Sequence, residues 1–262
     1  MHSAKTAYAV PRSQAAADKA ANVTLAVGGP IVGPNAVVNA ASYSTDATLS
    51  PGSLASLFGA NLAPSIAGAT TLPLPTTLGG VQVLVNGVAA PLLYVSPAQI
   101  NFQIPYEALG SNATVVVVSN NIQGISNILK LGMQLPGIFS RTANGQGAGA
   151  ILNADNSANS AANPAAAGSV IQIYATGLGA TNPPAVSGQP GSATRLNNVV
   201  NTPAVFIGGV QADVQFAGLA PGFVGLYQVN AVVPAATPPR SDVTVQIQAN
   251  GQNSNTVTIA VK

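Results

Sequence analysis

The chain has 262 residues, of which 47% are hydrophobic and only 5% are charged, with a formal net charge of +2. No apolar run approaches the ~20 residues that a membrane-spanning helix needs, because Gly, Pro, Asn and Ser interrupt every run. The Lys and Arg residues are scattered, which argues against a nucleic-acid-binding surface, and the absence of cysteine excludes disulfides and thiolate metal sites.

Residues 1–36 match neither of two internal repeats and are expected to form an N-terminal extension. The first twelve residues are mixed and polar, without the apolar core of ~7 to 15 residues that marks a signal peptide. Residues 22–27 alternate polar and apolar side chains, which is typical of a half-buried strand. Val23, Leu25 and Val27 form its apolar face. The strand either pairs within its own chain or adds to a sheet edge of a neighbouring copy.

The rest of the sequence repeats itself. Gly79–Gln82 (GGVQ) returns 129 residues later as Gly208–Gln211, and Gln99–Asn101 (QIN) returns at the same distance as Gln228–Asn230 (QVN). An earlier echo, between residues 51–54 and 167–170, has an offset of 116, which indicates an insertion in the second copy. Two copies of domain size are therefore predicted, at residues 37–138 and 139–262.

Short β-branched runs bounded by Gly, Pro and Asn occur throughout both copies, and no long segment has a helical period. The expected strands are Ser53–Phe58, Val81–Asn86, Pro91–Tyr94, Gln99–Ile104, Thr114–Ser119 and Asn127–Met133, then Ser169–Ala175, Ala204–Ile207, Val210–Phe216, Tyr227–Val232, Val243–Gln248 and Thr256–Val261. The sequence predicts an all-β protein of two tandem immunoglobulin-like antiparallel β-sandwiches. Matched apolar residues are expected to face the two cores: Phe58 with Tyr174, Tyr94 with Phe223, and Val85 with Val214.

Two stretches of each copy carry a family resemblance. Gly52–Leu62 resembles the opening strand and turn of IPT/TIG domains, and Val81–Pro105 resembles the middle of the same module. The second copy matches through Gly168–Gly179 and Val205–Pro234. The paired arrangement is also similar to an uncharacterised C-terminal region of large secreted acidobacterial proteins. This resemblance implies the immunoglobulin-like fold, and that family has no assigned catalytic residues.

The residue types that most catalytic sites need are scarce. The sole histidine is His2, so neither a Ser-His-Asp triad nor a zinc site is expected. Nothing in the sequence brings two carboxylates together for acid–base chemistry, although five are available, Asp46, Glu107, Asp155, Asp213 and Asp242. We therefore expect neither an enzyme nor a cofactor.

One segment offers alternating oxygen ligands for calcium. Asn153, Asp155 and Ser157 are spaced for this, but the closing glutamate of a strong calcium loop is missing. An Asx-rich turn is the alternative interpretation.

Two functions fit these observations. The first is an extracellular or cell-surface structural protein that assembles with copies of itself by strand addition, since the surface is poor in charge. The second is an adhesion or carbohydrate-binding module, for which Tyr43 and Tyr106 are the aromatic residues not assigned to a core.

Overall fold

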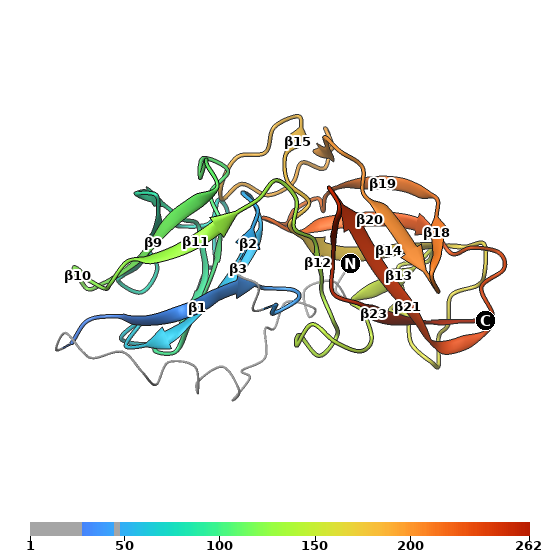
Figure 1. Cartoon of the computed structure of the whole chain (residues 1–262), viewed down its shortest axis with the longest axis horizontal. Helices are drawn as coiled ribbons and strands as arrows, with labels where there is room; N and C mark the ends of the chain where they lie inside the picture. Colours follow the sequence, from blue (N-terminus) through green and yellow to red (C-terminus); the bar gives the residue numbers. More distant parts are fainter. Residues whose placement is uncertain (1–27, 45–47) are drawn as a thin grey trace.

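The structure is a computed structural model that describes residues 28–44 and 48–262, and every regular element in these ranges is a β-strand. The expected strand with Val23, Leu25 and Val27 lies outside the described residues. Within those ranges, no helix has the length and apolar character to cross a membrane. Two sandwiches lie side by side, the first drawn in blue to green and the second in yellow to red (Figure 1).

The first sandwich has two facing sheets. One has the strand order β1 (Ile31–Asn39), β3 (Leu54–Ala60), β8 (Gln99–Gln103), β7 (Leu92–Val95) and β4 (Ala67–Gly68). The other has the order β2 (Thr48–Leu49), β11 (Asn127–Leu131), β9 (Asn112–Ser119), β5 (Val81–Val85) and β6 (Val88–Ala89), with β10 (Ile122–Gln123) paired to β9. The runs β1-β3-β8-β7 and β5-β9-β11 correspond to strands A-B-E-D and C-F-G of the immunoglobulin fold.

The second sandwich repeats this arrangement. One sheet has the order β12 (Gly137–Ile138), β14 (Val170–Thr176), β20 (Tyr227–Val232), β19 (Val214–Leu219), β16 (Asn198–Val199) and β15 (Thr181–Asn182), with β13 (Ile151–Asn153) also paired to β14. The other has β18 (Val210–Ala212), β17 (Ala204–Ile207), β21 (Arg240–Ala249) and β22 (Gln252–Asn253), with β23 (Val257–Val261) paired to β21. The predicted all-β fold of two tandem immunoglobulin-like sandwiches is confirmed.

Both expected domain boundaries fall inside these sheets. Ile31 in β1 pairs with Ala60 in β3, so residues 31–36 belong to the first sandwich and not to the extension. The pairing shifts register between Val32 and Val37, where residues 33–36 form a bulge in the strand. At the other boundary, Gly137–Ile138 pairs with β14 of the second sandwich.

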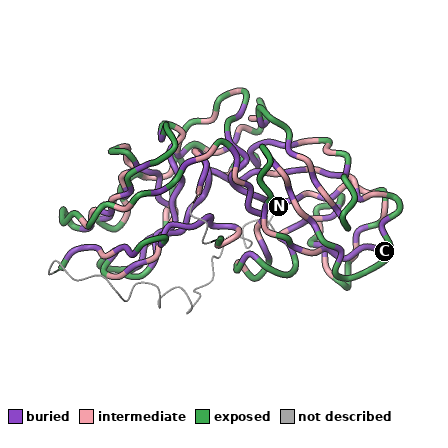
Figure 2. The backbone as a smooth tube through the Cα atoms, in the orientation of Figure 1, coloured by how far each residue is buried: buried purple, intermediate pink, exposed green. Residues whose placement is uncertain are grey.

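Each sandwich has its own apolar core, visible as the buried inner strands of Figure 2. Alternation places Leu57 and Ile173 in the cores, and their neighbours Phe58 and Tyr174 therefore lie on the outer faces, where they are only half-buried. The prediction that these two aromatic residues face the cores is wrong. Among the described residues, the aromatic side chains that are fully buried are Phe102 and Tyr227.

The two copies match with a different register from the one that the sequence suggested. Gly208-Gly209 forms the turn of the β17–β18 hairpin, and its counterpart in the β5–β6 hairpin is Asn86-Gly87, not Gly79-Gly80. Val85 is therefore structurally equivalent to Ile207 rather than to Val214. Tyr94 is equivalent to Phe216 rather than to Phe223.

The QIN and QVN echo does hold, because Asn101 pairs with Tyr94 just as Asn230 pairs with Phe216. The offset thus grows from 122 to 129 between these paired residues, because the second copy has longer strands there and a β19–β20 loop that is four residues longer than the β7–β8 loop at residues 96–98. Residues 220–226 form this longer loop.

Candidate functional site

The longer loop of the second copy docks on the first sandwich. Gly225 has a φ of +63°, and a Cβ atom there would lie 2.8 Å from Cδ2 of Leu54, so only glycine permits this approach. The fully buried Thr176 hydroxyl accepts a hydrogen bond from Leu54 N (2.8 Å) and donates one to Gly225 O (2.8 Å). One side chain thereby ties β3, β14 and the loop together.

A second set of contacts extends the joint between the sandwiches. Gln103 accepts a hydrogen bond from Gly188 N (2.8 Å) and donates one to Gly52 O (3.2 Å). Gln103 lies in β8 of the first sandwich, whereas Gly188 lies between β15 and β16 of the second. Because Gln103 is almost completely buried, these bonds satisfy an amide that water cannot reach.

Tyr106, expected as a ligand-binding residue, lies in this joint. Its hydroxyl is 3.3 Å from the hydroxyl of Tyr227, which donates a hydrogen bond to Gly179 O, and its backbone N donates to the Ser187 hydroxyl (2.9 Å). Burial raises the pKa of both tyrosines, that of Tyr227 well above its ordinary value. The position makes Tyr106 part of the contact between the two sandwiches.

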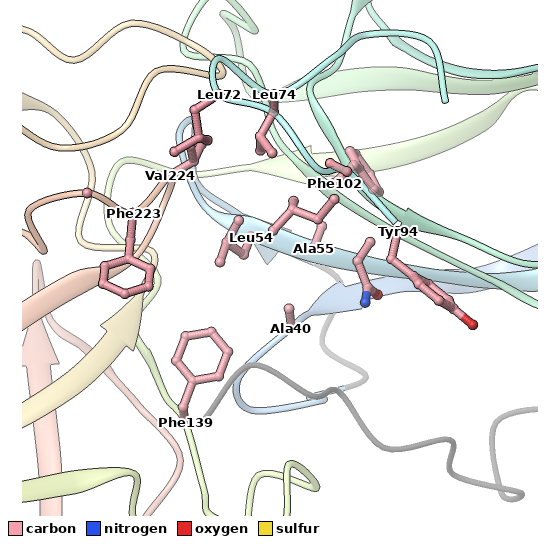
Figure 3. A pocket seen from close by; sticks show the side chains of 14 residues that line it. Ala40, Leu54, Ala55, Leu72, Leu74, Tyr94, Phe102, Phe139, Phe223 and Val224 are labelled. Atoms are coloured by element: carbon pink, nitrogen blue, oxygen red, sulfur yellow. The ribbon is translucent and has the colours of Figure 1, made fainter. Parts of the chain in front are cut away.

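An apolar groove of about 440 Å³ lies where the two sandwiches meet. Figure 3 labels Phe139 and Phe223 of the second sandwich and Leu54 and Tyr94 of the first among the residues that line it. Leu72, Leu74 and Val224 contribute further apolar surface, and Asn101 contributes a polar group. Its lining is mostly apolar.

The groove uses aromatic residues that the sequence assigned to the cores. Tyr94 and Phe223 are half-buried and line the groove, so their predicted core role is wrong. Gly222, Phe223 and Val224 belong to the longer β19–β20 loop. The change of offset in the sequence indicated an insertion ahead of Gly208, whereas part of it lies in this later loop.

Tyr43, the other expected ligand-binding residue, lies over the outer face of the first A-B-E-D sheet. Its ring centroid is 6.4 Å from that of Phe58, with the planes tilted by 32°. Burial raises the pKa of its hydroxyl, and the neighbouring Ser56 hydroxyl acts in the opposite direction. Tyr43 is not among the residues that line the groove.

The calcium candidates hold one another in a turn. The Asp155 carboxylate accepts hydrogen bonds from the backbone N of Ser157 (3.0 Å) and from its hydroxyl, which lowers the pKa of Asp155. Asn153 donates to Asn163 O (3.0 Å) and accepts from Asn159 (3.0 Å). These bonds form the Asx-type turn that the sequence left as the alternative.

The remaining acidic residues that the structure describes are dispersed, and Asp46 lies outside the described residues. In residues 28–44 and 48–262, no three His, Cys, Asp or Glu side chains come together as metal ligands. Asp242 forms an exposed ion pair with Arg240 (2.9 Å), and Glu107 accepts a hydrogen bond from Ser187 (2.6 Å).

No family model and no curated protein sequence matches the chain. Among solved structures, a surface glycan-binding protein B from Bacteroides ovatus, in complex with a mixed-linkage heptasaccharide, is 15% identical with a TM-score of 0.33. That match covers 83% of this chain and 44% of the other, so the chain spans less than half of that protein's length. The I9–I11 tandem of titin is 11% identical (82% and 62% covered, TM-score 0.23), and domains 5–6 of the S-layer protein SbsC are 10% identical (88% and 98% covered, TM-score 0.25). Because these TM-scores are low, the fold assignment rests on the strand order described above.

Proposed function

We propose that the chain is a non-catalytic, extracellular or cell-surface module that binds a neutral glycan in the groove between its two sandwiches. The observation that carries this proposal is that Tyr94, Phe139 and Phe223, from both sandwiches, line one groove together with the Asn101 amide. Aromatic rings offer flat apolar surfaces to the C–H faces of sugar rings, and amides match sugar hydroxyls as donors and acceptors.

The charge distribution supports a neutral ligand. Of the described residues that line the groove, none is charged, so a sugar meets no ion on these walls. The joint also supports the proposal, because the Thr176 and Gln103 hydrogen bonds hold both walls in place before a ligand arrives. Preorganised walls reduce the entropy that binding costs.

Affinity gel electrophoresis tests this function with dextran, soluble starch, hydroxyethylcellulose and galactomannan, and with alginate as a charged comparison. We expect at least one neutral polysaccharide to retard the protein, and the Tyr94→Ala/Phe223→Ala variant to be retarded less. Phe206→Ala is the matched control, because Phe206 is also half-buried but lies on the C-F-G sheet of the second sandwich. Equal retardation by every gel, with or without polysaccharide, would refute the proposal.

A second candidate function is self-association, and an exposed sheet face favours it. The outer face of the first C-F-G sheet carries Leu84, Val116, Val118 and Ile128, the last of which is 70% exposed. Their counterparts in the second sandwich, from the strand pairing, are Phe206, Gln246, Gln248 and Thr258. The first copy is thus more apolar than the second at three of four equivalent positions, which fits a face covered by a second copy of the chain.

Sedimentation of the Val116→Gln/Val118→Gln variant tests this candidate, since these are the residues that the second copy carries. A loss of oligomers supports self-association through this face, and an unchanged mass contradicts it. Strand donation by Val23, Leu25 and Val27 is tested separately by deleting residues 1–27, a deletion that leaves β1 intact. If the deletion variant assembles as the full chain does, strand donation is ruled out.

A further inference from the structure

The outer face of the second A-B-E-D sheet combines amides with aromatic rings. Across the strands, Gln172 pairs with Asn230 and Asn230 pairs with Phe216, while Tyr174 pairs with Gln228 in the adjacent row. Leu152 of β13 continues the first row beside Gln172. We name these six half-buried residues, Leu152, Gln172, Tyr174, Phe216, Gln228 and Asn230, the amide–aromatic face.

The first sandwich carries the same constellation in the same register. The counterparts of Tyr174, Phe216, Gln228 and Asn230 are Phe58, Tyr94, Gln99 and Asn101, and the amide-to-amide hydrogen bond is repeated. Gln99 donates to Asn101 Oδ1 (2.8 Å), as Gln228 donates to Asn230 Oδ1 (2.9 Å). Tyr94 and Asn101 are the residues that this face contributes to the groove.

The two faces differ in how far they are covered. Asn101 and Gln99 are 7% and 8% exposed, and the Ser56 between them and Tyr43 is fully buried. In the second sandwich the corresponding amides are only half-buried. Among the described residues, the Asn230 Nδ2 group and the Gln228 Oε1 atom have no protein partner, so a donor and an acceptor remain for a ligand.

The chemistry of this face selects a neutral polyhydroxylated ligand. None of its six residues is charged, and the two rings, on β14 and β19, flank the amides of β20. Such a face offers apolar area to the flat side of a sugar ring and hydrogen bonds to its hydroxyl edge. A charged ligand would find no ion to pair with.

We infer that the amide–aromatic face is a second glycan-binding site that binds a neutral polysaccharide chain. Its Phe216 and Asn230 occupy the same positions in the second sandwich as Tyr94 and Asn101 of the groove occupy in the first. This inference rests on the proposed function for the class of ligand. Two sites in one chain make the protein bivalent, and binding to a long polymer then exceeds that of either site by a factor on the order of 10².

The test is a calorimetric titration with an oligosaccharide fragment of whichever polysaccharide retards the full chain in the gel assay. The wild-type chain is expected to bind two fragments. The Tyr174→Ala/Phe216→Ala variant and the Tyr94→Ala/Phe223→Ala variant are each expected to bind one, with affinity at the altered site roughly tenfold lower or worse. Asn230→Ala removes only an amide at the face, and it serves if the double variant fails to fold.

The outcomes separate the two proposals. One fragment per wild-type chain, with no effect of the Tyr174/Phe216 or Asn230 variants, overturns the second site and leaves the groove standing. One fragment that is lost in those variants but kept in the Tyr94/Phe223 variant supports the face and overturns the groove. No retardation by any neutral polysaccharide overturns both.

Discussion

Replacing Thr176 by valine should weaken the joint between the sandwiches while preserving side-chain shape. The substitution removes the hydroxyl that accepts from Leu54 N and donates to Gly225 O, both at 2.8 Å, in a site with no measurable solvent exposure. Both backbone groups then lose their partner in a buried position, and each unsatisfied group costs about 1–3 kcal/mol. We expect a total loss of about 3 kcal/mol in the free energy of unfolding.

Thermal unfolding followed by circular dichroism measures this loss. For a chain of this size 1 kcal/mol corresponds to roughly 3 °C, so Tm should fall by about 9 °C. The control is Thr244→Val, the same chemical change at an exposed position on β21, which should leave Tm nearly unchanged. If Thr176→Val lowers Tm no more than Thr244→Val does, the hydroxyl does not hold the sandwiches together.

Three further predictions concern backbone conformation, pH and core orientation. Gly177 (φ +83°) and Gly251 (φ +73°) both have a positive φ, which strains any residue other than glycine. A Cβ at Gly177 would also overlap the Leu135 carbonyl oxygen, whereas a Cβ at Gly251 would meet open space. Gly177→Ala should therefore lower Tm several degrees more than Gly251→Ala, and equal shifts would contradict the close contact. The pKa of buried Tyr227 is raised above its ordinary value of 10.0, so above pH 10 the unfolded chain loses a proton that the folded chain keeps, and stability falls as pH rises. Unfolding midpoints in urea between pH 8 and 11.5 should decline less steeply for Tyr227→Phe than for the wild type, and parallel slopes would show that Tyr227 is not the group responsible. Finally, Phe102→Ala should lower the free energy of unfolding by about 3–5 kcal/mol, because Phe102 fills the first core. Phe58→Ala on the outer face should lower it much less. If urea unfolding gives the reverse order, Phe58 faces the core after all.

The sequence located most strands because β-branched runs and their Gly, Pro and Asn boundaries are local signals. The bounds of Ala204–Ile207 and Tyr227–Val232 were predicted to the residue. The direction of side chains was harder, since Leu57-Phe58 and Ile173-Tyr174 are apolar at both successive positions. Two-residue alternation then does not say which member faces inward.

The candidate site was less accessible from the sequence. Pairing Tyr94 with Phe223 assumed one offset across the middle of the repeat, whereas the offset changes by seven residues between the paired positions of β19 and β20. The groove joins Leu54, Phe139 and Phe223, which are far apart in the chain and belong to different sandwiches. No periodicity encodes such a meeting, because it depends on how two folded units dock.

The docking surfaces of the two copies are not interchangeable. At the positions of Gln103 and Tyr106 in the first copy, the second has Val232 and Ala235, and at the position of its long 220–226 loop the first has only a short turn. Head-to-tail contacts between identical units propagate without limit unless one unit lacks a complementary half. Here each copy keeps a single half, so this contact could join a third repeat only if that repeat stood between the two copies and carried both halves.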